Sequence, residues 1–210
     1  MSFITTLQVV LAHEGGYGND PNDRGGETFR GISRRANPGW PGWPLIDMVK
    51  IAVGAKAEAI DEHFRGDPHM ASLVAELYRL KYYNPVARFT TRERPLDKMF
   101  EAGVNIGPGG AIRIAQRIVG TKADGAIGPM TLAAATAYFA QPGAEDIFIA
   151  SFCHLQLEGY IKDIARNPSQ LKYINGWKAR AAWRPAGAVG CLRPIYRIKG
   201  RGGYVRGADR

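Results

Sequence analysis

The chain has few of the residues that metal centres and disulfide frameworks require. Its 210 residues include two cysteines and four histidines. Cys153 and Cys191 are too few for a disulfide framework or a zinc knuckle, and no two histidines have the i, i+4 spacing of a zinc-binding helix. We therefore expect buried or idle thiols and no metal ion.

Long apolar runs are also missing. No window approaches the ~18 uninterrupted apolar residues of a membrane-spanning helix, and residues 1–15 lack the basic start of a secretory signal peptide. With 45% hydrophobic and 22% charged residues, the composition excludes disordered, collagen-like and integral-membrane proteins. We expect one compact body that is made in a cytoplasm and depends on another protein for any export.

Acidic residues are scarce at the C-terminal end. Residues 161–210 contain 12 Lys and Arg against 2 Asp and Glu, whereas residues 1–160 contain 16 against 17. A basic end on a neutral body suggests an extended anionic partner, which could be nucleic acid, anionic lipid or a cell-wall polymer. Charge alone also allows a solvated tail that improves solubility.

Helical periodicity dominates the chain and strand-like alternation is almost absent, so the fold class is mainly α. We expect helices ending at Glu14, over 46–64 with an interruption at Gly54, from an Asp67 cap to Tyr82 and Tyr83, and over 95–104, 111–118, 129–140 and 144–165. The segment 144–165 is apolar nearly all round, as in a central buried helix. An Asn167 cap begins the last helix, which turns Leu171, Ile174, Trp177 and Ala181 inward. Residues 15–31 predict a turn-dense loop or small hairpin, residues 40–44 a non-helical segment, and residues 186–210 an irregular tail.

Glu14 stands at a helix end beside a glycine-dense loop that brings back Asp20, Asp23, Glu27 and Thr28. The partial negative charge of a helix C-terminus favours a protonated carboxyl group, which suits a general acid. A second carboxylate that stays ionised in the loop could orient a water molecule, as in glycosidases. A solvated helix end followed by ordinary turns fits the same spacing. A calcium loop fits less well, because the EF-hand ligand order is missing.

The stretch Glu14-Gly15-Gly16-Tyr17, followed by Asn19-Asp20-Pro21-x-Asp23-x-Gly25-Gly26-x-Thr28-x-x-Gly31-Ile32, resembles the signature of glycoside hydrolase family 108 lysozymes. These are N-acetylmuramidases found among phage endolysins. The resemblance continues through Tyr82-Tyr83-Asn84-Pro85, where the family usually has Tyr-Trp. It also includes residues 100–109, where Glu101 and Ile106 replace the usual Asp and Ser. Residues 111–132 and 166–180 resemble the predicted peptidoglycan-binding segment of such enzymes.

This resemblance covers roughly residues 4–184 and implies a lysozyme-like helical body with a small loop or hairpin at the active site. The implied parts are a muramidase part over 1–94, a helical peptidoglycan-binding part over 95–185 packed with it as one body, and a basic tail over 186–210. Glu14 would be the catalytic acid. Asp23 and Thr28 would follow it in the order Glu, Asp, Thr that phage-type lysozymes share. Asp20 competes with Asp23, and the other implied substrate-binding residues are Tyr17, Tyr83 and Asn105. Tyr17, Trp40 and Trp43 are candidates for sugar stacking. Tyr17 and Asn105 could equally be structural residues, and the three aromatic residues could equally belong to the core.

The resemblance implies an endolysin that hydrolyses the β-1,4 bond between N-acetylmuramic acid and N-acetylglucosamine, without a cofactor and as a monomer. Its partners would be peptidoglycan and, through the basic tail, anionic envelope polymers or lipid head groups. It would wait in the host cytoplasm for a holin-type pore. The rivals are a lytic transglycosylase, which the carboxylate-rich loop disfavours, and a non-catalytic wall-binding protein. We expect no nucleic-acid partner, because no motif for one is present.

Overall fold

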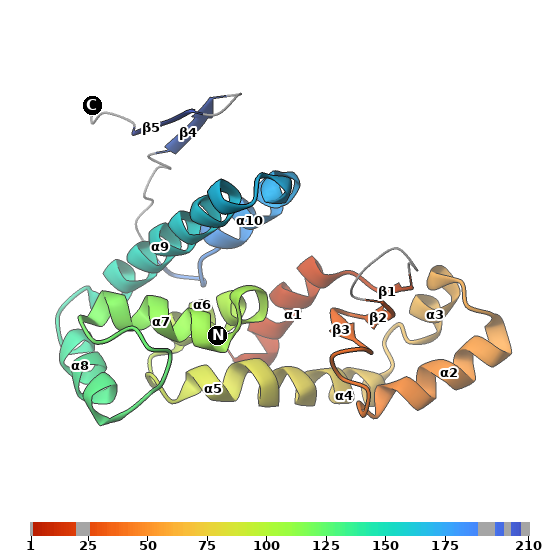
Figure 1. Cartoon of the computed structure of the whole chain (residues 1–210). Coiled ribbons are helices and arrows are strands. Elements are labelled where there is room, and N and C mark those ends of the chain that lie inside the picture. Colours follow the sequence, from red (N-terminus) through yellow and green to blue (C-terminus); the bar gives the residue numbers. More distant parts are fainter. Residues whose placement is uncertain (1, 20–25, 189–195, 200–202, 207–210) are drawn as a thin grey trace.

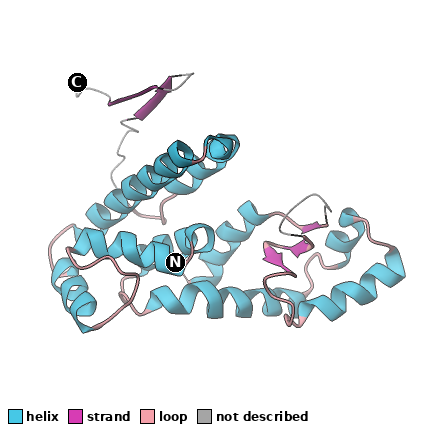
Figure 2. Cartoon of the chain, in the orientation of Figure 1, coloured by secondary structure: helices cyan, strands magenta, loops and turns pink. Residues whose placement is uncertain are grey.

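The computed structural model describes residues 2–19, 26–188, 196–199 and 203–206 (Figure 1). Helices dominate these residues and short strands are confined to two places, so the predicted mainly α class is confirmed (Figure 2). The elements are, in order, α1 (Phe3–Glu14), β1 (Tyr17–Gly18), β2 (Thr28–Phe29), β3 (Ile32–Ser33), α2 (Gly42–Val53), α3 (Ala57–His63), α4 (Pro68–Tyr78), the π-helix η1 (Arg79–Tyr83), α5 (Asn84–Ala87), α6 (Glu93–Ile106), α7 (Pro108–Val119), α8 (Pro129–Phe139), α9 (Ala144–Arg166), the 3-10 helix η2 (Pro168–Tyr173), α10 (Ile174–Ala182), β4 (Tyr196–Lys199) and β5 (Gly203–Arg206).

Helix ends follow the capping signals of the sequence at several places. α1 ends at Glu14 as predicted, since Gly15 takes a φ of +76° that ends the helix. The carboxylate of Asp67 accepts the amide N–H of Met70 at 2.7 Å and caps α4. The predicted interruption at Gly54 separates α2 from α3. The prediction of these boundaries is confirmed.

Two local predictions are wrong. The sequence predicts a non-helical segment over 40–44, but α2 begins at Gly42 and includes residues 42–44. Pro44 is tolerated there because residues in the first helical turn donate no hydrogen bond within the helix. Leu171 is 49% exposed rather than inward-facing. The Asn167 cap starts the 3-10 helix η2 instead of an α-helix, so the inward-facing pattern begins only at Ile174.

The central buried helix is α6, not α9. Every residue from Pro95 to Gly103 is buried, and α6 packs against α1, α7, α9 and α10. α9 buries one face and exposes Ile147, Lys162 and Asp163. The prediction that residues 144–165 form the central helix is therefore wrong. The charged side chains of α6 hid its burial from hydropathy.

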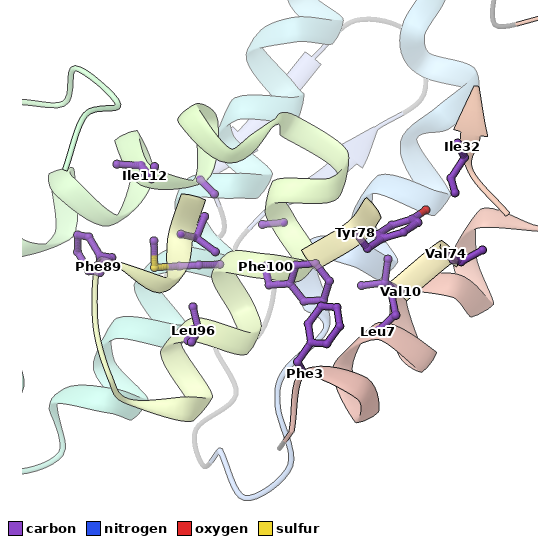
Figure 3. Close-up of a cluster of buried hydrophobic side chains, with 14 of the residues drawn as sticks. Phe3, Leu7, Val10, Ile32, Val74, Tyr78, Phe89, Leu96, Phe100 and Ile112 are labelled. Atoms are coloured by element: carbon purple, nitrogen blue, oxygen red, sulfur yellow. The ribbon is translucent and has the colours of Figure 1, made fainter. Parts of the chain in front are cut away.

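One hydrophobic core joins the two sides of the molecule. In Figure 1 the strands β1 to β3 and the helices α2 and α3 lie on one side of α1, and α7 and α8 lie on the other. Figure 3 shows buried side chains running from Phe89 and Ile112 through Phe100 and Phe3 to Tyr78 and Ile32. Residues on both sides of the expected boundary at 94 and 95 share this core. The boundary itself stays a prediction.

The small sheet has the antiparallel order β1-β2-β3. Arg30 and Gly31 connect β2 to β3 with φ angles of 45° and 77°, the two positive values of a type I′ hairpin turn. Strands therefore frame the segment that we expected to be a loop or small hairpin. β4 and β5 also pair as antiparallel strands. An irregular tail is thus the wrong description for residues 196–199 and 203–206, where strand-favouring Tyr, Ile and Val recur.

The helices in the described ranges are all too short or too polar to cross a membrane.

Candidate active site

Glu14 lies at the point where α1, α10 and the β2–β3 turn meet. Its side chain is one-fifth exposed. Oε1 accepts a hydrogen bond of 2.5 Å from Nη2 of Arg180 on α10, and the two residues are 166 positions apart in sequence. An ion pair between largely buried groups fixes the position of the carboxylate far better than a solvated helix end would.

The ion pair continues into the protein as a chain of alternating charges. Nη1 of Arg180 lies 3.8 Å from Oε1 of Glu101, and Oε2 of Glu101 lies 3.2 Å from Nζ of Lys98. Nζ of Lys98 also donates to the backbone carbonyl of Arg180 at 2.8 Å. The side chains of Lys98 and Glu101 are fully buried. Glu14, Arg180, Glu101 and Lys98 form one cluster, which we call the buried ion chain.

Two tyrosines of the long helix formed by α4 and η1 face Glu14. Burial raises the pKa of Tyr78, and the negative charge of Glu14 raises it further. Burial and the same charge also raise the pKa of Tyr82. Both hydroxyl groups therefore keep their protons and stay neutral beside the carboxylate.

The tip of the β2–β3 hairpin packs directly on this carboxylate. A Cβ atom added to Gly31 would lie 2.8 Å from Oε2 of Glu14 and 2.6 Å from the hydroxyl oxygen of Tyr78. Two independent reasons require glycine at position 31: its φ is +77°, and a side chain would have no space. The hairpin therefore positions the reactive end of Glu14.

The glycine at position 16 has a steric reason of its own. A Cβ atom there would overlap the Asp61 carboxylate at 2.0 Å. Oδ1 of Asp61 accepts the amide N–H of Tyr17 at 2.8 Å. Asp61 on α3 thus holds the chain as it leaves α1 and enters β1.

Among the sequence-predicted site residues, Thr28 lies closest in the chain to the hairpin tip. It begins β2 opposite Gly18 and Ser33, and its hydroxyl oxygen lies over Gly18. Phe29 points into the core, so Thr28 points to the other face of the sheet. Asp20 and Asp23 lie outside the described residues, between β1 and β2. Their roles stay predictions.

Glu27, the other acid of this loop, is fully occupied. Its carboxylate accepts the hydroxyl group of Tyr17 at 2.8 Å and pairs with Nζ of Lys50 at 2.9 Å and Nε of Arg34 at 2.7 Å. The ring of Tyr17 is 6% exposed, so it lies in the core and offers no free face. Tyr17 therefore packs in the core and supports the loop through its hydrogen bond to Glu27, and its ring does not line an open cleft.

Asn105 and Tyr83 lie in two different places. Asn105 is exposed in the last turn of α6, and its Oδ1 accepts the hydroxyl group of Tyr160 at 2.6 Å. Tyr160 stacks on Trp177 with ring centroids 4.9 Å apart. Tyr83 packs edge-on against Phe3, at the opposite end of α1 from Glu14. The structure thus brings Asn105 to the α9–α10 side of α6 and keeps Tyr83 a helix length away from the carboxylate.

Trp40 and Trp43 are core residues. They are 5% and 2% exposed, and their indole N–H groups donate to the carbonyl oxygens of Leu73 and Asn37 at 3.2 and 2.7 Å. Of the two roles that the sequence allowed for Trp40 and Trp43, the structure supports the core role, because both rings are almost fully buried.

Sequence reasoning missed Arg180, Tyr78 and the buried pair Lys98–Glu101. Arg180 and Glu101 both stand within the matched motifs, but spacing alone could not pair residues so distant in sequence. The sequence does carry one signal for this pair. Lys98, Glu101 and Asn105 stand at positions i, i+3 and i+7, so they form one polar face of the helix. That polar face of α6 points toward α9 and α10.

The stretch Asp124-Gly125-x-x-Gly128-Pro129 has a structural role. The side chain of Gln116 is buried, accepts the amide N–H of Gly125 at 2.8 Å, and donates to Oδ1 of Asp124 at 3.0 Å. Among the described residues no three His, Cys, Asp or Glu side chains gather as metal ligands would.

Comparison with known families accounts for most of the chain. Residues 7–107 match the family described as Glycosyl hydrolase 108, and residues 110–182 match the one described as Predicted Peptidoglycan domain. A comparison with curated proteins found no match. A solved structure, "Structure of Brucella abortus SagA", aligns with a TM-score of 0.53 and 24% identity over 85% of this chain and 92% of that chain. An identity this low demonstrates a shared fold alone.

Glu14 and the hairpin lie in the first matched segment, and Arg180 lies in the second. The matches make this chain a glycoside hydrolase with a peptidoglycan-binding segment. The suspected relationship is therefore confirmed: residues 7–107 match the glycosyl hydrolase 108 family, and residues 110–182 match the predicted peptidoglycan domain.

Proposed function

We propose that this glycoside hydrolase is an N-acetylmuramidase, a lysozyme that hydrolyses the β-1,4 bond between N-acetylmuramic acid and N-acetylglucosamine in peptidoglycan. The observation that carries the proposal is the position of Glu14. A single carboxylate at the end of α1, one-fifth exposed, is held between Arg180 and the hairpin tip within the glycosyl hydrolase 108 segment.

In this proposal Glu14 is the general acid that protonates the glycosidic oxygen as the bond breaks. Asp23 holds a water molecule for attack on the anomeric carbon from the opposite face, and Thr28 helps to place that water. The occupied carboxylate of Glu27 supports this division of roles. Since Glu27 already binds Tyr17, Lys50 and Arg34, the loop acids that remain for a second role are Asp23 and its competitor Asp20.

The products distinguish the proposed bond from others. Purified walls digested with the full chain are reduced with borohydride and analysed by mass spectrometry. A muramidase leaves reduced muramic acid at the new ends. Reduced glucosamine at those ends would identify a glucosaminidase and contradict the proposal.

The same experiment separates hydrolysis from the rival lytic transglycosylase. That reaction uses no water and leaves an anhydro end, which is lighter by one water molecule and resists reduction. Anhydro ends as the main product would replace the proposed reaction by the rival one. A Glu14→Gln control shows which ends depend on the acid.

We also propose the biological setting of a phage or prophage endolysin that lyses its host. In this setting the protein acts as a monomer, reaches the periplasm or cell wall through a holin-type pore, and uses its basic end to bind anionic envelope polymers or lipid head groups. The charge of residues 161–210 supports the last point. Lysis of cells only when a pore-forming protein is co-expressed would test the route.

A further inference from the structure

The catalytic carboxylate proposed above is held by a residue of the other segment. We propose that Arg180, from the predicted peptidoglycan domain, is a positioning residue of the glycosidase, and that its charge, shared with Glu101, stabilises the carboxylate that Glu14 becomes when it donates its proton. The inference rests on the proposed function, because it assigns Arg180 a role through Glu14. It makes the second segment a part of the reaction site as well as a wall-binding part.

Burial gives the contact its weight. The Arg180 side chain is 11% exposed, that of Glu14 is 20% exposed, and that of Glu101 is fully buried. Surface ion pairs contribute little, but a buried guanidinium that loses a partner leaves an uncompensated charge. The guanidinium of Arg180 therefore stays between the carboxylates of Glu14 and Glu101, because moving away would leave its buried charge uncompensated.

The backbone of Arg180 is fixed from the far side of the core. Its carbonyl oxygen accepts Nζ of Lys98 at 2.8 Å, and Lys98 is in turn paired with Glu101. Both partners lie on α6, the most buried helix. The position of the guanidinium, and with it the direction of the Glu14 carboxylate, is set jointly by α6 and α10.

The charges along the buried ion chain have opposite effects on the Glu14 proton. When Glu14 gives its proton to the leaving group, it becomes an anion, and Arg180 stabilises that anion directly. Glu101 offsets part of the positive charge of Arg180 and Lys98, so it weakens this effect. Removing Arg180 and removing Glu101 should therefore change proton release in opposite directions.

Among the residues that the structure describes, the other groups that face Glu14 are neutral or lie outside the contact; the proposed water-holding carboxylate, Asp23 or Asp20, is unchanged in every variant below. Tyr78 and Tyr82 from α4 and η1 keep their protons because burial raises the pKa of each. The hairpin tip contributes backbone atoms at Gly31. His13, on the same helix as Glu14, is exposed. From α9, Tyr160 faces Glu101 and Arg180 with a pKa raised to about 12, mainly by burial.

The test is the pH dependence of kcat/KM for wall-fragment hydrolysis by the full chain. If Glu14 must be protonated to act, the activity falls on the alkaline side as Glu14 loses its proton. Arg180→Gln should move this alkaline limb to higher pH, and Arg180→Lys should leave it near the parent position. Glu101→Gln should move it to lower pH. Lost packing alone cannot produce opposite movements.

A charge control comes from the same segment. Arg166 is exposed at the end of α9, so Arg166→Gln removes one positive charge without touching the buried ion chain, and its alkaline limb should stay in place. Circular dichroism shows whether Arg180→Gln is folded. If it is not, the alkaline limb of the Glu101→Gln variant tests the proposal instead, and a limb at the parent's position overturns it.

Failure of this inference and failure of the proposed function give different results. An inactive Glu14→Gln variant, together with unmoved limbs in Arg180→Gln and Glu101→Gln, overturns the role of Arg180 and leaves the proposed function standing. Parent-level activity in Glu14→Gln overturns both.

Discussion

The hydroxyl group of Tyr78 donates a hydrogen bond of 2.9 Å to the carbonyl oxygen of Arg30. This bond joins α4 to the first residue of the β2–β3 turn, and the second residue of that turn packs on the Glu14 carboxylate. Because burial and the charge of Glu14 raise the pKa of Tyr78, the hydroxyl group stays a donor. Three elements distant in sequence thereby fix the environment of one carboxylate.

Gly31→Ala tests whether the hairpin tip positions Glu14. The new methyl group would collide with Oε2 of Glu14 and the hydroxyl group of Tyr78, so wall hydrolysis should fall by at least about 10-fold. Gly66→Ala is a matched control, because Gly66 has a similar φ of +74° with open space around it. Both variants should lose about 1 kcal/mol of stability from the left-handed backbone. Equal activity in turbidity assays on purified walls would contradict the positioning role.

Tyr160 should contribute to a loss of stability at alkaline pH. Burial raises its pKa from 10.0 to about 12, so the folded state keeps a proton that the unfolded chain releases. The free energy of unfolding is then unaffected by this group below pH 10, and it falls as the pH rises toward 12, by at most about 2–3 kcal/mol. Tyr160→Phe should show a shallower decline in urea unfolding between pH 9 and 11. The exposed Tyr173→Phe should keep the parent's slope, and identical slopes in all three proteins would contradict the assignment.

The reaction should invert the anomeric configuration. A water-holding Asp23 requires room for that water, with the carboxyl groups of Glu14 and Asp23 roughly 6.5–9.5 Å apart. Proton NMR during the first turnovers should show the α anomer of the new reducing end. A β anomer would indicate a retaining reaction instead. Normal activity in Asp23→Ala together with an inactive Asp20→Ala would transfer the water-holding role to Asp20.

Local signals allowed the N-terminal part of the site to be predicted. The apolar rhythm of residues 3–14 and the glycines after it fixed the end of α1, and the matched motif named Glu14 before any geometry was known. Capping chemistry at Asp67 placed α4. These features depend on residues close in sequence, so the sequence carries them directly.

The partners of Glu14 could not be predicted in this way. Arg180 lies 166 residues away, and its charge is compensated by Glu101, whose spacing from Lys98 indicates a shared helix face but not that this face is buried. Trp40 and Trp43 are a second example, since the sequence alone left open whether they stack on sugars or pack in the core, and burial in the structure decides for the core. Periodicity indicates which face of a helix is apolar, but not which buried charges compensate one another.

The basic end should bind walls through its charge. Replacing Arg193, Arg197, Lys199, Arg201, Arg206 and Arg210 by Gln removes six of the positive charges of residues 161–210. This variant should bind whole walls more weakly at low salt and with a shallower salt dependence, because screening shortens the reach of charge to ~10 Å at 0.1 M. Turnover of small soluble fragments should hardly change. Unchanged affinity and salt slope in wall pull-down assays would limit the charge to a role in solubility.

The central claim is that Glu14 supplies the catalytic proton, and activity of the Glu14→Gln variant on purified peptidoglycan measures it most directly. Gln keeps the shape of the side chain but has no acidic proton to donate. Its amide oxygen can still accept the hydrogen bond from Arg180, and Arg180 keeps the charge of Glu101 as compensation, so the thermal midpoint should change little. The account predicts a loss of hydrolysis on the order of 100-fold or more with the fold intact. More than a few per cent of parent activity in a folded Glu14→Gln variant would contradict it.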